Sequence, residues 1–333
     1  MTATTGQVDE QAVHAGGARG RRKRRARATR GDSRLAWRLI APTIVLLLVV
    51  IGYPVVYAVV KSLQLDKADA GINPKTGFFE QGGKYVGLKY YRYWFHCNCP
   101  NGTTGHEFWP ALQTTVIFTV ITVAFEVVLG VMMALVMHRA FKGRGIVRAA
   151  ILIPWAIPTA VTAKLWYYMF QPQGVVNAVL GTNIIWLGSE WPARWAVMAG
   201  DIWKTTPFVA LLVLAGLQVI PDELYESARV DGASAWQRFF SITLPLVKPA
   251  LLVAVLFRVL DVLRIFDLPY ILTQGANNTT TLSILSVQEL RSSQNAAAAL
   301  STITFVFIFV VAFFLVKIFS VRVVETQART VKA

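Results

Sequence analysis

Six long apolar runs alternate with shorter polar segments along this chain of 333 residues. Each run supplies the roughly 20 residues that an α-helix, rising about 1.5 Å per residue, needs to cross a bilayer. None of the runs alternates with the period of two expected of a barrel strand, so the sequence predicts an all-α membrane protein. The predicted spans cover residues 37–61, 109–137, 146–170, 195–220, 242–273 and 297–320.

The composition supports membrane insertion, because 55% of the residues are hydrophobic and only 15% are charged. The net charge of +15 is unevenly spread, and residues 1–38 hold ten Lys and Arg against three acidic residues. A basic run directly before a span is typical of a cytoplasmic tail near lipid headgroups. No basic module interleaved with aromatic residues accompanies it, so nucleic-acid binding is not expected.

Charge in the short loops predicts the orientation in the membrane. The loop 138–145 and the C-terminal tail are basic like the N-terminal tail, and six spans would put all three on one side. The positive-inside rule makes that side the cytoplasm, which then also holds the segment 221–241. We expect a disordered basic tail over 1–35, a six-helix transmembrane domain over 36–320 and a cytoplasmic tail over 321–333.

The polar segment between the fourth and fifth runs predicts two short helices with a break between them. Pro221 suits the first turn of a helix, and Gly232 can take the left-handed conformation that ends one. Ser234 can cap a second helix over 235–240. The apolar side of that second helix carries Trp236, Phe239 and Phe240.

The same segment carries a spaced motif: Glu226-Ser227-Ala228, three residues, Gly232, nine residues, then Ile242-Thr243-Leu244-Pro245. It resembles the EAA signature of the permease subunits of bacterial ABC importers, from which only Ser227 departs. The resemblance implies an ABC type I importer permease fold, with a cytoplasmic coupling helix that docks into an ATP-binding subunit. The residues it assigns to coupling are Glu226, Ser227, Ala228, Asp231, Gly232, Trp236 and Phe239.

The stretches 203–208, 214–221 and 258–275 are similar to the carbohydrate-uptake branch of these importers. This resemblance implies a permease that forms half of the translocation path for a sugar. The sugar it favours is a disaccharide such as trehalose or maltose. It further implies a multi-pass protein of the bacterial inner membrane with both termini in the cytoplasm. The implied partners are a second homologous permease, two ATP-binding subunits and an external substrate-binding protein.

No catalytic motif is present, and the chain lacks the G-x-x-x-x-G-K-[ST] loop that cradles ATP. We therefore expect no enzyme activity, no metal site and no cofactor in this chain, with ATP and Mg bound by partner subunits.

The fifth run contains four charges, Arg258, Asp261, Arg264 and Asp267, that alternate in sign every three residues. Neighbours at i and i+3 meet on a helix surface and can neutralise each other. Two interpretations stay open: a ladder that only holds helices together, or a polar wall of the translocation path. The candidate path residues are Arg258, Asp261, Arg264, Asp267, Tyr270, Gln274 and Thr205.

Glu126 and Asp201 lie in the second and fourth runs and allow an alternative, a proton-coupled secondary transporter of a polar solute. Such a transporter would not explain the docking segment, and no inverted repeat is visible.

The first outer segment, 62–108, contains His96, Cys97, Cys99 and His106. The C-x-C spacing is not a standard zinc pattern, and a disulfide across one residue is geometrically tight. A disulfide and free thiols are the two main alternatives, and a metal site is the least favoured of the three.

Overall fold

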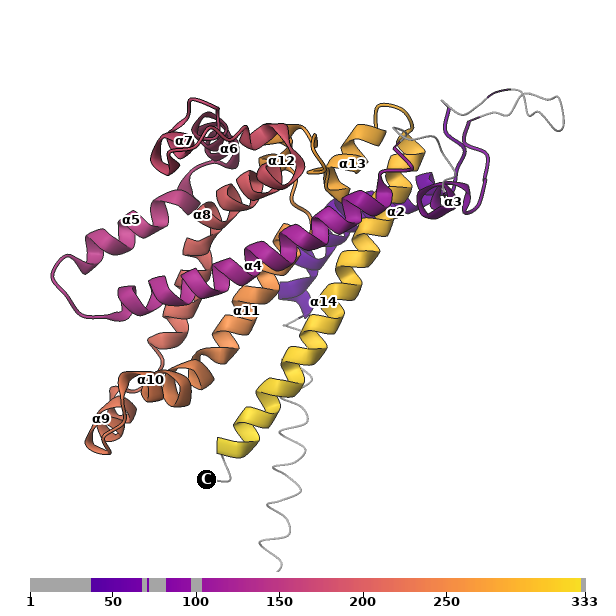
Figure 1. The fold of residues 1–333 in the computed structure, drawn as a ribbon. Coiled ribbons are helices and arrows are strands. Elements are labelled where there is room, and N and C mark those ends of the chain that lie inside the picture. Colours follow the sequence, from indigo (N-terminus) through magenta and orange to yellow (C-terminus); the bar gives the residue numbers. More distant parts are fainter. Residues whose placement is uncertain (1–36, 68–70, 72–81, 97–103, 331–333) are drawn as a thin grey trace, which may run out of the picture. The chain divides into compact units, whose positions relative to one another are not determined.

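The computed structural model describes residues 37–67, 71, 82–96 and 104–330, and most of these residues are helical (Figure 1). Residue contacts divide the chain into two units, 1–58 and 59–333. The helices are η1 (Leu48–Gly52), α2 (Tyr53–Ser62), α3 (Lys89–His96), α4 (Phe108–His138), α5 (Arg144–Ala156), α6 (Thr159–Met169), α7 (Val175–Leu180), η2 (Trp186–Gly188), α8 (Glu190–Leu217), α9 (Asp222–Val230), α10 (Ala235–Arg238), η3 (Phe239–Thr243), α11 (Leu244–Val262), α12 (Asp267–Thr273), α13 (Leu282–Glu289) and α14 (Gln294–Thr330).

Most predicted spans are confirmed as helices. Within the described residues, five helices are long and apolar enough to cross a membrane, and a bent pair could supply a sixth crossing. The five helices are Trp37–Ser62, Phe108–His138, Glu190–Leu217, Ala235–Val262 and Gln294–Phe319.

The third predicted span, 146–170, is a bent pair of helices rather than one continuous helix. It consists of α5 and α6, which meet at an angle of 91°. Pro154 lies inside α5 and Pro158 caps α6, and a proline removes a backbone donor and clashes with the preceding turn. The 13 residues of α5 rise about 20 Å, less than the roughly 30 Å of the hydrocarbon core.

The fifth predicted span also needs correction at both ends. The helix stops at Val262 rather than at residue 273, and α12 starts separately at Asp267. At its other end α11 continues without a break into η3 and α10, so one helical run extends from Ala235 to Val262. The predicted boundary between a second coupling helix and this span does not exist.

Close backbone approach joins α4 to α8, which pack along much of their length (Figure 1). A Cβ atom added to Gly130 of α4 would lie 2.7 Å from Cγ1 of Val209 on α8. Small residues allow such approach in membranes, where dispersion contacts drive helix association. Gly130 therefore sets the spacing between these two helices.

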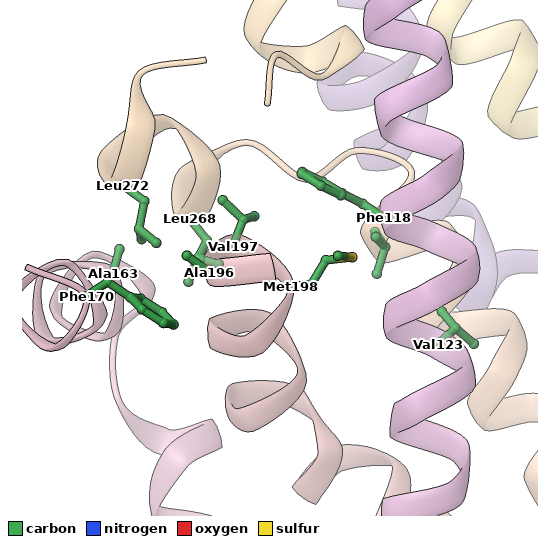
Figure 2. Close-up of a cluster of buried hydrophobic side chains, with 10 residues drawn as sticks. Phe118, Val123, Ala163, Phe170, Ala196, Val197, Met198, Leu268 and Leu272 are labelled. Carbon is green, nitrogen blue, oxygen red and sulfur yellow. The ribbon is translucent and has the colours of Figure 1, made fainter. Parts of the chain in front are cut away.

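Figure 2 shows one of the buried apolar clusters in the unit 59–333. Phe118 and Val123 come from α4, and Ala196, Val197 and Met198 come from α8. Ala163 and Phe170, from α6 and its C-terminal end, meet Leu268 and Leu272 of α12 on the other side of α8. The cluster fixes the bent segment and α12 against the same end of α8.

Several sequence predictions lie outside the described residues. The basic tail 1–35 and both cysteines, Cys97 and Cys99, are among them, so the alternatives for the cysteines stay open. The helix α14 extends to Thr330, beyond the predicted end of the last span at residue 320.

Candidate functional site

The predicted docking segment forms two short helices at one end of the helical unit, α9 and α10 (Figure 1). Gly232 lies between them with φ +78°, the left-handed conformation that its sequence position suggested. Ser234 caps α10: its hydroxyl accepts from the N–H of Gln237, and Oε1 of Gln237 accepts from the N–H of Ser234 at 2.7 Å.

Side-chain hydrogen bonds hold α9, the turn at Gly232 and α10 together. Arg238 donates to the carbonyl oxygen of Ala233 at 2.6 Å. Tyr225 of α9 shares a hydrogen bond of 3.1 Å with the hydroxyl of Thr243 in η3. The segment is therefore held in shape from inside and continues directly into α11.

Three aromatic rings cluster on α10 and η3. Trp236 is 73% exposed and Phe240 57% exposed, and their rings stack with centroids 6.0 Å apart. Phe239 is half-buried and meets both rings edge-on. Large exposed aromatic side chains grouped beside a polar segment mark an interaction surface.

The other predicted coupling residues surround this aromatic group. Glu226, Ser227 and Asp231 are exposed, and Ala228 is half-buried. Glu226 also borders a cavity of about 490 Å³ between α9, α10 and the end of α4. The charged and titratable residues that line the cavity are His138, Arg139, Asp222, Glu226, Arg229 and Arg238.

A second polar group lies deep between α4, α8 and α11 and is centred on Arg258. Its guanidinium donates to both carboxylate oxygens of Glu126 at 2.6 and 2.7 Å. It also donates to Asp201 at 2.9 Å and to Asp261 at 2.6 Å. The side chains of Arg258 and Glu126 are buried, so the bidentate pair satisfies charges that lipid could not solvate.

The predicted four-charge ladder is therefore only partly correct. Arg258 and Asp261 do pair, and Arg264 lies 3.9 Å from Asp261. However, α11 ends at Val262, so Arg264 lies past the helix and Asp267 opens the next one. Two of the three carboxylates that contact Arg258 come from other helices, because Glu126 of α4 and Asp201 of α8 are remote in the sequence and reach it only through packing.

A pocket of about 220 Å³ opens beside this polar group. Of the predicted path residues, Thr205, Arg258, Asp261 and Arg264 line it, whereas Asp267, Tyr270 and Gln274 do not. Asp261 and Arg264 keep 57% and 70% of their side-chain surface exposed, so both can meet a ligand.

Three aromatic residues that the sequence analysis did not single out complete the pocket: Trp155, Phe208 and Phe257. The rings of Trp155 and Phe208 stack with centroids 5.9 Å apart, and Phe257 meets Phe208 edge-on. Trp155 directly follows Pro154, which interrupts the third apolar run. That proline was the one sequence feature that could have indicated that Trp155 leaves the line of a regular span. The pocket thus combines aromatic faces with a carboxylate, guanidinium groups and a hydroxyl.

A family model described as "Binding-protein-dependent transport system inner membrane component" matches residues 126–325. The chain is 40% identical to the trehalose transport system permease protein SugA of Mycobacterium tuberculosis, over 86% of this chain and 89% of that protein. It is 38% identical to the trehalose/maltose transport system permease protein MalF of Thermococcus litoralis, over 83% and 90% of the two chains.

Among solved structures, a chain of a bacterial ABC transporter involved in the import of alginate is similar in fold. It superposes with a TM-score of 0.69 at 23% identity, covering 89% of this chain and 98% of that one. At this identity the likeness concerns the fold alone.

Proposed function

This chain belongs to the family of binding-protein-dependent transport system inner membrane components, and we propose that it is the permease subunit of an ATP-driven sugar importer. It forms half of the translocation path for a disaccharide such as trehalose or maltose. The observation that carries the sugar assignment is the similarity, over most of both chains, to trehalose and trehalose/maltose permeases.

The chemistry of the aromatic pocket suits such a substrate. Sugar hydroxyls donate and accept hydrogen bonds, and Asp261, Arg264 and Thr205 offer both kinds of partner. The faces of Trp155 and Phe257 can cover the apolar face of a pyranose ring. We assign this pocket, rather than Asp267, Tyr270 or Gln274, as the sugar-contacting part of the path.

We assign the segment α9–α10 to coupling. The exposed ring pair Trp236–Phe240 is the apolar part of the surface that enters a groove on an ATP-binding subunit. Glu226 and Asp231 supply its negative charge for basic residues of that partner. ATP hydrolysis then takes place on two partner subunits, and an external binding protein delivers the sugar to this chain and a second, homologous permease.

The function is tested with the whole complex reconstituted in proteoliposomes. We expect labelled trehalose or maltose to enter only when ATP and the external binding protein are both present, with no response to collapse of the proton gradient. Uptake that follows a proton gradient without ATP would instead support a secondary transporter. A panel including an acidic saccharide tests the disaccharide assignment separately from ATP dependence.

A further inference from the structure

The carbonyl group of Ile157 lies at the break between α5 and α6, where the regular hydrogen bonding of a helix stops. The backbone N–H groups of Val161 and Thr162 both donate to Pro158, at 3.0 and 3.1 Å. The carbonyl of Ile157 instead accepts from the ammonium group of Lys204 on α8, at 2.5 Å. An uncompensated carbonyl in a membrane is costly, so this bond stabilises the bend.

Lys204 connects the bend to the polar group around Arg258. It lies on α8 between Asp201, which pairs with Arg258, and Thr205, which donates to Glu126 at 2.6 Å. Lys204 therefore shares its stretch of α8 with two members of that polar group, while its ammonium group donates to a different helical segment.

Ile157, whose carbonyl accepts from Lys204, lies two residues after Trp155. The indole of Trp155 stacks on Phe208, which is one turn beyond Lys204 on α8, and both rings line the pocket. One side of α8 therefore fixes the bent segment twice: through the backbone at Ile157 and through the ring at Trp155.

We propose that Lys204 is a positioning residue for the sugar pocket: by holding the carbonyl of Ile157, it keeps the indole of Trp155 against Phe208 and so sets the width of the pocket. The meaning for sugar recognition rests on the proposed function, whereas the geometric effect does not. Lys204 touches the backbone, not the pocket, and acts on the substrate only through Trp155.

The test uses the complete complex labelled with fluorotryptophan and ¹⁹F NMR spectroscopy. The resonance of Trp155 is identified by its loss in Trp155→Phe, and its sensitivity to stacking is calibrated with Phe208→Leu. Three variants are compared: Lys204→Met, which removes the donor, Lys204→Arg, which retains charge and donors, and Lys164→Met, a matched control. Lys164 is an exposed lysine on α6 that lies over the ring of Tyr167.

We expect Lys204→Met to move the Trp155 resonance toward its position in Phe208→Leu, and Lys204→Arg and Lys164→Met to leave it in place. Sugar uptake by Lys204→Met at saturating binding protein should fall about tenfold or more, because small misplacements of substrate-positioning groups have effects of this size. Basal ATP hydrolysis should persist, and Lys204→Arg should restore most of the uptake.

An unchanged Trp155 resonance in Lys204→Met overturns the proposal, whether or not uptake falls. If this variant does not assemble, Lys204→Met is combined with Asp261→Asn, which removes one charge of each sign. The Trp155 resonance of the double variant is then compared with that of Asp261→Asn alone, and equal positions overturn the proposal. If the Trp155 resonance shifts in Lys204→Met, the positioning role is supported. If the unaltered complex takes up no disaccharide, the proposed substrate is rejected, and the positioning role still stands.

Discussion

At the scale of single residues, one guanidinium joins three helices. Arg258 of α11 meets carboxylates from α4 and α8 as well as its own helix, and its side chain is only 2% exposed. Loss of Glu126 would remove two of the four hydrogen bonds to a guanidinium that lipid cannot solvate. Arg258 and its carboxylate partners therefore connect three helices, and Arg258 and Asp261 also line one side of the pocket.

Replacing Glu126 by Gln or Leu tests the structural role. The buried Arg258 would lose its bidentate partner, so we expect the folded complex to lose about 3–5 kcal/mol of stability. The measurement is thermal unfolding of the purified complex. Glu190→Gln is the control, because Glu190 is 43% exposed and Arg194 keeps its hydrogen bonds to Asn278 and Thr114, so the loss should be about 1 kcal/mol or less. Equal losses in the two variants would contradict a special role for Glu126.

Neutralising Asp261 tests the pocket wall. Asp261→Asn leaves Arg258 paired with Glu126 and Asp201, so the complex should assemble. We expect sugar uptake to fall roughly tenfold, since a hydrogen bond to a charged group is worth about 1.5–3 kcal/mol. Asp267→Asn is the matched control, because Asp267 is exposed and lies outside the pocket. Similar losses in both variants would extend the path along all four charges of the predicted ladder.

At the scale of elements, the break in the docking segment depends on one backbone conformation. Gly232 has φ +78° with open space around its Cα, so a substitution there acts through strain rather than through a clash. Gly232→Val should uncouple ATP hydrolysis from transport while the protein still inserts, because β-branched residues resist this conformation. We would measure sugar-stimulated ATPase activity and uptake.

The control is Gly232→Asn, since asparagine tolerates left-handed backbone, and it should retain most of the coupling. Normal stimulated ATPase activity and uptake in Gly232→Val would show that the break does not transmit the signal.

The spacing of α4 and α8 depends on a second glycine. Gly130→Val would place side-chain atoms into Val209, and we expect a loss of about 1–3 kcal/mol from overpacking. Gly145→Val in α5 is the control, because a Cβ at Gly145 meets no atom within 4 Å. Thermal unfolding of both complexes gives the comparison, and equal melting temperatures would argue that the two helices can separate without cost.

The local features of these elements could be predicted from the sequence, because caps and turns depend on neighbouring residues. Ser234 and Gly232 behave as expected for that reason. The bidentate partner of Arg258 could not be predicted, since Glu126 is 132 residues away and meets it only after α4 and α11 have packed. The end of α11 was missed because the apolar run continues through residues 263–273, although the helix itself stops.

At the scale of the whole molecule, the lengths of the apolar runs predicted where the spans lie but did not predict the bend between α5 and α6. Hydropathy averages over about 20 residues, and the run 146–170 is apolar on average although two prolines divide it. The pocket was found only in part for the same reason: Trp155 enters it through this bend, from an element that otherwise reads as a continuous span.

The orientation of the chain in the membrane is tested with single cysteines in a background where Cys97 and Cys99 are replaced by serine. Cysteines introduced at Thr104 and Ser189 should react with an impermeant maleimide from outside, and one at Ser234 only after permeabilisation. Labelling of the Ser234 position in sealed cells would reverse the orientation that we propose.

The helical run from Ala235 to Val262 directly connects the docking segment to the pocket. It has 28 residues and is about 40 Å long, with the exposed aromatic rings near one end and Arg258 and Asp261 near the other. A tilt of about 10° around its middle would displace each end by about 3 Å, more than a hydrogen bond can stretch. A displacement of Trp236 would therefore reach the pocket as a movement of the charged residues Arg258 and Asp261 that line it.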